Sequence, residues 1–370
     1  MTKLLSFLSI LFLVSTSFAV DDFDAPFLFE EVDASQNLGQ KSFTKAKNFL
    51  KNDIYPSHQE GIYCGCTYDK QVVVKDYQEE KLKALTRYKL FHWDSEEGFQ
   101  YPTEEEFNNK KPTYKLVPNP ETCGFEPKGN GTRAKQMEWE HVVPASFFGH
   151  TFSEWENGHD TCISTPRQVR KCKRLNAVEL RSVASEPKCT TDPATGVQTC
   201  VSKDIVCETY MSDPKPYSGR RCLTKVSEEY SLMQADMHNL YPAIGDVNGY
   251  RSNFPMAEIA GEAREFGKCD AEIKDKKFEP RNEVRGDIAR THFYMQDAYK
   301  AHMPISDEMY EMLKRWNDLD PVDTWECDRN KKIAELQGNE NEFVSKPCEK
   351  LLKRNAKRKG IFQVLFDLFK

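Results

Sequence analysis

After its first 19 residues the chain has no apolar run long enough to cross a bilayer, so no membrane-spanning segment is expected beyond them. It has no internal repeat, which excludes solenoid architectures, and no Cys-x-x-Cys pair, which argues against a structural zinc site. The lack of His-Glu-x-x-His argues against a secreted metalloprotease. Basic residues number 52 against 58 acidic ones, so the chain cannot coat nucleic acid over its whole surface, although a local basic cleft is still compatible.

The N-terminal residues carry a targeting pattern. Lys3 precedes the apolar run LLSFLSILFLVSTSFA, which ends in a small-x-small pattern at Ala19, and this layout predicts a secretory signal peptide over residues 1–19. A membrane anchor is the alternative, but the run is shorter than the roughly 20 residues that a span needs. Residues 20–41 are polar and acidic and are expected to form a flexible arm. The protein is therefore expected to be secreted or periplasmic.

The cysteines also point to an oxidising compartment. All twelve follow residue 19, and an even number in an exported chain predicts up to six disulfides, whose pairing the sequence leaves open. Four of them fall in the loop-rich block 163–218, which is expected to be an insertion stapled by its own disulfides. These four are Cys172, Cys189, Cys200 and Cys207.

Short strands are expected in the first half of the chain and helices in the second. Helical spacing of apolar residues marks 42–56, and strands are expected within 61–74 and 136–146. Ser306 and Gly338 have the residue types of an N-cap and a C-cap for two later helices. With 39% hydrophobic residues the chain supports a real core. The predicted fold class is α+β: a mixed, helix-rich single domain with short strands.

Two segments hold the polar residues best suited to catalysis. MEWEHVVPAS contains Glu138, Glu140 and His141, and ADMHNLYPAIGDVNGYRSNF contains Asn248 and Arg251 among apolar anchors. Oxygen ligands at this density suit magnesium or calcium, and magnesium usually keeps water or phosphate in most of its positions. A histidine near its ordinary pKa is a natural general base at neutral pH.

Glu140 and His141 are neighbours, and neighbours on a regular strand face opposite sides of it. The pair can serve one site only if the strand ends or bends there. Val142-Val143-Pro144 supplies such a boundary. The carboxylate is then expected to hold a cation while the imidazole faces the attacking water.

With these segments the chain resembles the endonuclease I family of periplasmic and secreted non-specific nucleases, whose catalytic motif is the ββα-metal motif, or His-Me finger. The resemblance rests, in chain order, on FTKAKNFL, YCGC, EWEHVVPA, ADMHNLYPAIGDVNGYRSNF, IARTHFYM and WECDRNKKIAELQGNENEFV. It implies one catalytic domain over 42–348. The block 163–218 departs from the family pattern, and 349–370 is an added basic and apolar tail.

The resemblance also implies roles for single residues. His141 is expected to be the general base that activates water. Glu140 and Asn248 are the expected protein ligands of Mg²⁺, in a site that Mn²⁺ or Ca²⁺ could also enter. An arginine of SGRRC is expected to hold the phosphate; Arg220 is the better positional match and Arg221 is the alternative.

Other polar residues of the two segments are given lesser roles. Glu138 either orients waters or ligands of the site or is a plain surface acid. Arg251 is expected to assist substrate binding. Asp236 and His238 are interpreted as structural, with His238 tying a loop to a strand.

The implied activity is that of a secreted, Mg²⁺-dependent, sequence-nonspecific endonuclease that leaves 5′-phosphate ends. DNA is the expected main partner and RNA the second, with no small-molecule cofactor and a monomeric protein. The alternative is a secreted, disulfide-rich nucleic-acid-binding protein that keeps the scaffold without turnover. The basic run in 349–370 could contact phosphates, dock on the body or lie at a membrane surface.

Overall fold

The computed structural model describes residues 41–92, 95–129, 131–174, 188–202, 205–261 and 264–368. All of them belong to one compact unit, Asn37–Lys370. The predicted signal peptide at 1–19 and the arm at 20–41, apart from its last residue, lie outside the described residues. Within the described ranges, no helix combines the length and apolarity that a membrane crossing needs.

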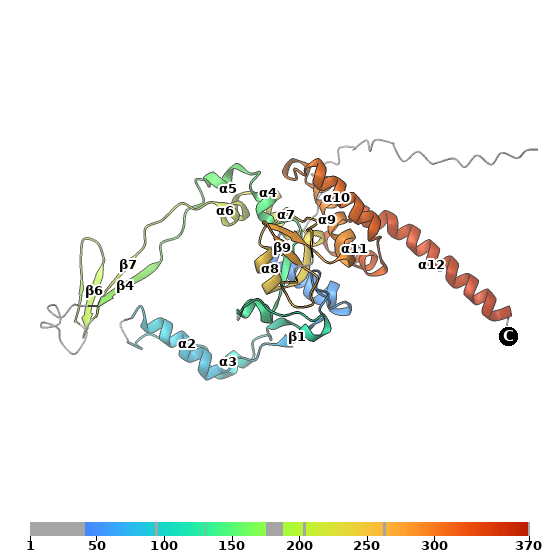
Figure 1. Ribbon diagram of the computed structural model, residues 1–370. Coiled ribbons are helices and arrows are strands. Elements are labelled where there is room, and N and C mark those ends of the chain that lie inside the picture. The colour runs from blue at the N-terminus through green and yellow to red at the C-terminus, as the bar shows by residue number, and fades with distance from the viewer. Residues whose placement is uncertain are drawn as a thin grey trace, which may run out of the picture. The chain divides into compact units, whose positions relative to one another are not determined.

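Helices and small antiparallel sheets build the described chain, which confirms the predicted mixed, helix-rich class (Figure 1). The α-helices are α1 (Phe43–Phe49), α2 (Tyr77–Lys89), α3 (Glu104–Asn108), α4 (Ala145–Gly149), α5 (Ser153–Asn157), α6 (Gly219–Val226), α7 (Glu228–Ala235), α8 (Gly245–Arg251), α9 (Arg285–Ala298), α10 (Asp307–Leu319), α11 (Thr324–Gln337) and α12 (Glu342–Leu368). The strands are β1 (Tyr68–Val72), β2 (Tyr114–Pro118), β3 (Met137–His141), β4 (Gln168–Arg174), β5 (Lys188–Thr191), β6 (Gln198–Ser202), β7 (Ile205–Met211), β8 (Leu240–Ile244), β9 (Glu272–Lys274) and β10 (Lys277–Glu279).

Two strands and the helix that follows them carry most of the predicted site. β3 pairs antiparallel with β8, so that Glu140 lies opposite Tyr241 and His141 opposite Leu240. Helix α8 begins at Gly245, directly after β8. A Cβ on Gly245 would lie 2.6 Å from the Arg133 carbonyl oxygen, so only glycine lets α8 start this close to the segment before β3.

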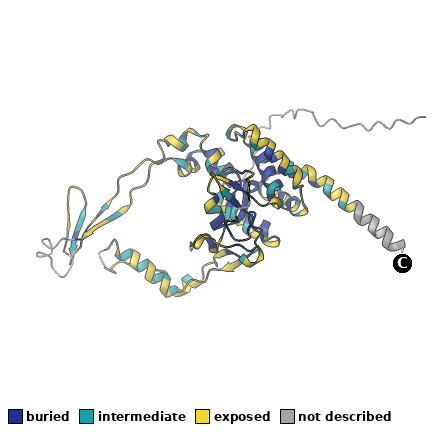
Figure 2. Cartoon of the chain, in the orientation of Figure 1, coloured by how far each residue is buried: buried dark blue, intermediate teal, exposed yellow. Residues whose placement is uncertain are grey.

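The apolar core packs around this strand–strand–helix unit. Every residue of β8 is buried, and Val247 of α8 joins the same core cluster as Ile288 of α9 and Trp316 of α10. Burial at the scale of a whole cluster is the main stabilising term for such a fold. Figure 2 shows the contrast with α2, which has no buried residue and is coloured exposed or intermediate along its length.

Helix ends and strand positions follow the local sequence signals. The Ser306 hydroxyl accepts a hydrogen bond from the Met309 amide at 3.3 Å, and Gly338 ends α11 with φ 95°, so both predicted caps are confirmed. The helix predicted over 42–56 is observed as α1, continued by a π turn at Leu50–Ile54 and a 3-10 turn at Tyr55–Ser57.

The predicted first strand is shorter than 61–74. It is confined to β1, and two disulfides fix the residues before it in addition to a β-bridge between Glu60 and Thr67. Cys64 is joined to Cys269 and Cys66 to Cys123. The CGC sequence therefore ties the start of the domain to two later segments.

The cysteine-rich block forms a sheet of its own, in the order β4-β7-β6-β5 (Figure 1). Cys172–Cys207 joins β4 to β7, and Cys189–Cys200 joins β5 to β6. These two bonds join the block to itself, as its clustered cysteines predicted; that the block is an insertion stays a prediction. A third disulfide, Cys162–Cys222, ties the residue before the insertion to α6.

The tail predicted at 349–370 begins inside α12, a single long helix (Figure 1). Cys348 in its second turn is bonded to Cys327 of α11, which fixes the helix to the body at that point. Leu352 is 54% exposed. The side chains beyond residue 356, which include the apolar stripe expected to dock or to lie at an interface, are outside the described residues.

Candidate active site

A cavity of about 510 Å³ brings together most of the predicted site residues. Its lining comes from α1, the 3-10 turn before β3, β3 itself, the start of α4, α6, and α8 with the turn after it. The lining residues are Phe43, Arg133, Glu138, Trp139, Glu140, His141, Pro144, Ala145, Ser146, Arg220, Asn248, Arg251, Ser252 and Asn253. Of the residues predicted for the site, Arg221 is the one that does not line it.

The end of β3 explains how Glu140 and His141 both reach this cavity. β3 stops at His141, and Asn239 fixes the departing chain through its side-chain amide. The Asn239 Oδ1 accepts from the Val143 amide at 2.7 Å, and its Nδ2 donates to the Val143 carbonyl at 2.9 Å. The strand therefore ends at the boundary that the sequence predicts, and the two neighbours face one space.

The His141 ring is held by its surroundings on two sides. Its Nε2 lies 2.8 Å from the Gln234 carbonyl oxygen, which can only accept, so Nε2 carries the hydrogen and Nδ1 keeps the lone pair. The ring also stacks on Phe43, with 5.1 Å between ring centroids.

Burial changes the acidity of this ring. It lowers the pKa of His141 to about 4, the Gln234 bond opposes that shift, and the charges of Arg220 and Arg251 add to it. The assumption that the base has an ordinary pKa is therefore wrong, because desolvation disfavours the imidazolium. The ring is neutral, and able to accept a proton, at all pH values well above 4.

Glu140 is buried beside a tyrosine and an arginine. The Tyr63 hydroxyl donates to Glu140 Oε1 at 3.0 Å, and Arg251 Nη1 donates to the same oxygen at 2.8 Å. Burial raises the pKa of Glu140 despite these partners. A carboxylate in such surroundings gains from an additional cation.

The buried Arg251 side chain links Glu140 to the backbone at the end of β3. Its Nη1 also donates to the His141 carbonyl at 3.0 Å, and its Nη2 donates to the Val142 carbonyl at 2.6 Å. With 1% of its surface exposed, Arg251 holds Glu140 and the end of β3 in place. A direct contact between Arg251 and substrate stays a prediction.

Glu138, two residues before Glu140 on β3, lies next to Asn248 of α8. Asn248 Nδ2 donates to Glu138 Oε2 at 2.8 Å, and Arg133 Nε donates to Glu138 Oε1 at 2.9 Å. The Asn248 amide group is thus oriented by Glu138, and no described residue donates to its Oδ1. Glu138 is more than a plain surface acid: it orients the predicted ligand Asn248.

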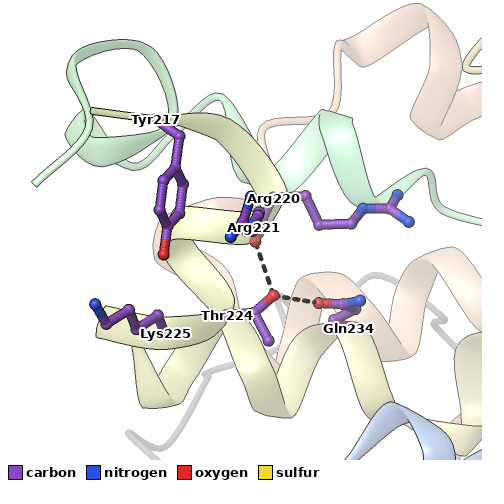
Figure 3. A pocket seen from close by; sticks show the side chains of 6 residues that line it. All are labelled: Tyr217, Arg220, Arg221, Thr224, Lys225 and Gln234. Atoms are coloured by element: carbon purple, nitrogen blue, oxygen red, sulfur yellow. Dashed lines mark hydrogen bonds between the residues drawn. The ribbon is translucent and has the colours of Figure 1, made fainter. Parts of the chain in front are cut away.

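The two arginines of SGRRC go different ways from α6. Figure 3 shows Arg220 extending away from Tyr217, while Arg221 lies against that ring. Arg220 lines the cavity that holds His141, and both arginines line a second cavity of about 540 Å³ beside α6. The disulfide Cys162–Cys222 fixes the helix immediately after them.

Asp236 and His238 do not line either cavity, and the structure supports their structural interpretation. Asp236 accepts hydrogen bonds from the hydroxyls of Tyr294 and Tyr299 at 2.7 and 2.8 Å and from Gln337 Nε2 at 2.8 Å. His238 Nε2 lies 3.1 Å from the Asn339 carbonyl oxygen. Both are 1% exposed, so their hydrogen bonds connect the segment before β8 to later parts of the chain within the core.

Four residues of the site have no role predicted from the sequence. Phe43 stacks on His141, the Gln234 carbonyl selects the tautomer of that ring, Tyr63 donates to Glu140, and Arg133 pairs with Glu138. All but Arg133 come from segments far from EWEH. Their roles depend on tertiary packing, which spacing in one sequence does not report.

Comparison with known proteins gives the chain its family. The profile described as endonuclease I matches residues 42–348. The chain belongs to the endonuclease I family. It is 28% identical over 312 residues to an extracellular deoxyribonuclease of Aeromonas hydrophila, covering 84% of this chain and 90% of that protein. Membership makes this chain an enzyme, a hydrolase that acts on nucleic acid.

Two further relatives have similar names. A periplasmic deoxyribonuclease of Aeromonas hydrophila is 31% identical over 238 residues, which cover 64% of this chain and 74% of that protein. Endonuclease-1 of Buchnera aphidicola is 28% identical over 315 residues, which cover 82% of this chain and 98% of that protein. In the described part of this chain no cluster of three or more His, Cys, Asp or Glu side chains is arranged to hold a metal ion.

Proposed function

We propose that this nuclease is a secreted, Mg²⁺-dependent, sequence-nonspecific endonuclease that cleaves DNA with His141 as its general base. One observation carries the proposal. His141, with its Nδ1 free to accept a proton, lines the same cavity as Glu140, Asn248 and Arg220. A base, oxygen ligands and a phosphate-binding cation are the groups that phosphodiester hydrolysis needs.

The residues present fit a hard divalent cation. Glu140 offers carboxylate oxygen, and Asn248 offers an amide oxygen whose group is oriented by Glu138. Two protein ligands would leave the other positions to water and phosphate, which is the habit of Mg²⁺, and a set of two would not form a three-residue cluster. The bound cation would neutralise charge on the phosphate during attack. We expect Mn²⁺ or Ca²⁺ to enter the same site.

The protein's own groups then divide the reaction. His141 Nδ1 takes the proton of a water molecule while the Gln234 carbonyl keeps the ring oriented through Nε2–H. Arg220, with its planar fork of donors, holds the phosphate oxygens. Attack on phosphorus with departure of the 3′ oxygen leaves a 5′-phosphate end. The enzyme discriminates weakly between bases if most of its contacts go to phosphates, because phosphate contacts carry no sequence information.

Secretion and the DNA substrate rest on the relatives and the disulfides. The two Aeromonas hydrophila relatives are named as an extracellular and a periplasmic deoxyribonuclease. Six disulfides join all twelve cysteines of this chain. A chain oxidised to this extent belongs in an oxidising compartment. RNA as a second substrate and the monomeric state are part of the proposal.

The test is cleavage of supercoiled plasmid by the purified, oxidised protein with Mg²⁺, with and without EDTA. Wild type is expected to nick and linearise the plasmid only when the metal is present. His141→Ala is expected to lose activity by about 10²–10⁴-fold, the usual share of a general base. His150→Ala is the matched control, because His150 is exposed and lines neither cavity. An intact plasmid with wild type would favour the non-catalytic binding protein.

The same assay with Asn248→Ala tests the metal ligand. The half-saturating Mg²⁺ concentration is expected to rise by about tenfold or more, since a lost ligand or its orienting partner typically weakens metal affinity by that amount. An unchanged Mg²⁺ titration would remove Asn248 from the ligand set. Parallel digestion of single-stranded RNA decides the second substrate.

A further inference from the structure

Apart from Arg220 and Gln234, the residues that line the cavity beside α6 have no part in the chemistry proposed above, yet the composition of this cavity is that of an anion site. It is lined by Tyr217, Arg220, Arg221, Thr224, Lys225 and Gln234, and has a volume of about 540 Å³ (Figure 3). Three of these six residues are cations and none is an acid. A concave surface with one sign of charge concentrates ligands of the opposite sign.

We propose that this cavity binds the phosphodiester next to the one that is cleaved, with Arg221 as its principal donor. The nucleic-acid strand would then be held at two successive phosphates, one by Arg220 and one by Arg221. This inference rests on the proposed function, because it takes the His141 cavity as the place where the strand is cut.

The position of the cavity follows from two shared residues. Arg220 lines both cavities, so they are neighbours at this residue. Gln234 lines the α6 cavity, while its backbone carbonyl accepts from His141 Nε2. The Gln234 side chain is fixed by Thr224, whose hydroxyl lies 3.0 Å from Gln234 Oε1 (Figure 3). A strand bound at His141 would therefore have the α6 cavity within reach of its next phosphate.

Arg221 is prepared for a phosphate by its stacking partner. Its guanidinium carbon lies 4.3 Å from the centroid of the Tyr217 ring. Stacking on an aromatic face leaves the N–H groups at the edge of the guanidinium free to bind an anion in the plane. The stack also removes much of the side-chain freedom that binding would otherwise have to remove.

The charge pairing of the nearby arginines separates structural cations from available ones. Arg133 is paired with Glu138, and Arg251 is paired with Glu140. In the described part of the chain, neither Arg220 nor Arg221 forms an ion pair with a carboxylate. Two neighbouring arginines without internal counter-charges favour an external anion over a structural role.

The base of the insertion builds the outer wall of this cavity. The Tyr217 amide donates to the Cys162 carbonyl at 2.9 Å, and Cys162 is bonded to Cys222 of α6. The Lys225 ammonium donates to the Thr161 carbonyl, which places this third cation at the same junction. The insertion thus brings Tyr217, and through it Arg221, to the edge of the proposed active site.

The decisive experiment pairs Arg221→Ala with neutral phosphates in the substrate. Three short single-stranded DNAs of the same sequence are compared. In the first, all linkages are natural; in the second and third, a methylphosphonate replaces the linkage directly 5′ or directly 3′ of the central one, which stays natural. The rate of central cleavage with Mg²⁺ is measured for each. On natural DNA, Arg221→Ala is expected to slow central cleavage by about tenfold, as for the loss of a charged hydrogen bond.

On one of the two substituted substrates the effect of Arg221→Ala is expected to vanish, because the charge that Arg221 contacts is already gone. Equal slowing on all substrates, or no slowing at all, would overturn the proposal. Arg87→Ala is the matched control. It removes an exposed arginine from α2, and no described residue of α2 lines either cavity.

Tyr217 is a positioning residue in this scheme. Tyr217→Ala is expected to raise KM with little change in kcat, because Arg221 would keep its charge and lose its orientation. Tyr217→Phe should restore KM, since the ring face is retained. A kcat defect that Phe does not rescue would assign Tyr217 to the fold alone.

A binding measurement separates failure of this inference from failure of the proposed function. In EDTA, affinity for single-stranded DNA is measured across salt concentrations in the His141→Ala background. Arg221→Ala is expected to lower the slope of log affinity against log salt by about 0.7, the value for one lost phosphate contact. If wild type cuts no DNA but this slope changes, the subsite holds and the catalytic proposal fails. An unchanged slope contradicts the subsite whatever the activity.

Discussion

The β3–β8 sheet and the insertion sheet β4-β7-β6-β5 are stabilised in different ways. In the first, β8 is wholly buried, and Glu140 and His141 at the end of β3 are 4% and 7% exposed. In the second, the buried side chains among those described are Cys200, Cys207 and Thr209, and two disulfides cross the strands. The β3–β8 sheet is thus stabilised by burial and an internal charge pair, whereas disulfides reinforce the strand pairing of the insertion.

The buried charges therefore lie in the sheet that carries the proposed active site. A buried Glu140–Arg251 pair is weak evidence for net stability, but the loss of one partner leaves a charge buried without compensation. The insertion carries its charges on exposed strands, where substitution is cheap. Three sets of substitutions test this contrast between the two sheets.

Arg251→Ala is expected to destabilise the body by about 3–5 kcal/mol, because it unpairs Glu140 and leaves two backbone carbonyls without a donor. Denaturant unfolding followed by tryptophan fluorescence measures the loss. Arg167→Ala, at an exposed position in the insertion, is expected to change stability by less than about 0.5 kcal/mol. Equal costs for the two variants would erase the contrast between the sheets.

Acid is expected to have the next largest effect, a decrease in the free energy of unfolding of the domain outside the insertion. Burial lowers the pKa of His238 to about 4 and that of His292 to about 3, so both rings are neutral when folded. The unfolded chain binds their protons near pH 6.5, so the stability that they contribute is complete above that pH. It is lost as pH falls from about 6.5 toward 4, by up to about 3 kcal/mol for each histidine.

His292→Phe is expected to flatten this pH dependence, measured as the free energy of unfolding between pH 7 and 4.5. Neither nitrogen of His292 has a hydrogen-bond partner in the described residues, so the substitution removes a titrating group without breaking a bond. The insertion contains no histidine, and its amide-exchange protection should change less over the same range. A curve as steep as that of wild type would show that other groups carry the acid sensitivity.

Removal of the disulfides in the insertion is expected to have the smallest effect on the body. Cys172→Ser with Cys207→Ser should open the insertion to proteases while plasmid cleavage stays within about twofold, because the strands hold no residue of the proposed site. Cys162→Ser with Cys222→Ser should instead reduce cleavage by about tenfold or more, since it releases the start of α6 and with it Arg220. Equal activity in the two double variants would contradict a positioning role for Cys162–Cys222.

The parts of this molecule that the sequence predicts are those fixed by local chemistry. The Ser306 and Gly338 caps and the end of β3 before Pro144 depend on a few neighbouring residues. The insertion could be predicted because its cysteines are clustered. The roles of His141, Glu140, Asn248 and Arg220 came from family resemblance, and the structure adds that they share one cavity.

The remainder depends on long-range packing. Phe43 lies 98 positions before His141, and nothing in its own segment indicates an aromatic partner for the base. The lowered pKa of His141 is likewise a property of its burial, which a motif does not report. Arg251 could be recognised as polar and close to the site, but its hydrogen bonds to Glu140 and two carbonyls are visible only in the fold.

A β-bridge between Ile163 and Pro216 joins the two ends of the insertion, and this affects which insertion lengths the fold can tolerate. Because the insertion leaves and re-enters the body side by side, its length makes little difference to the geometry at Tyr217 and Cys162. The cost of closing a loop grows only slowly with its length. The junction is therefore expected to accept insertions of many lengths. A tight turn that joins residues 163 and 216 should give a shorter nuclease whose active-site geometry and activity are unchanged.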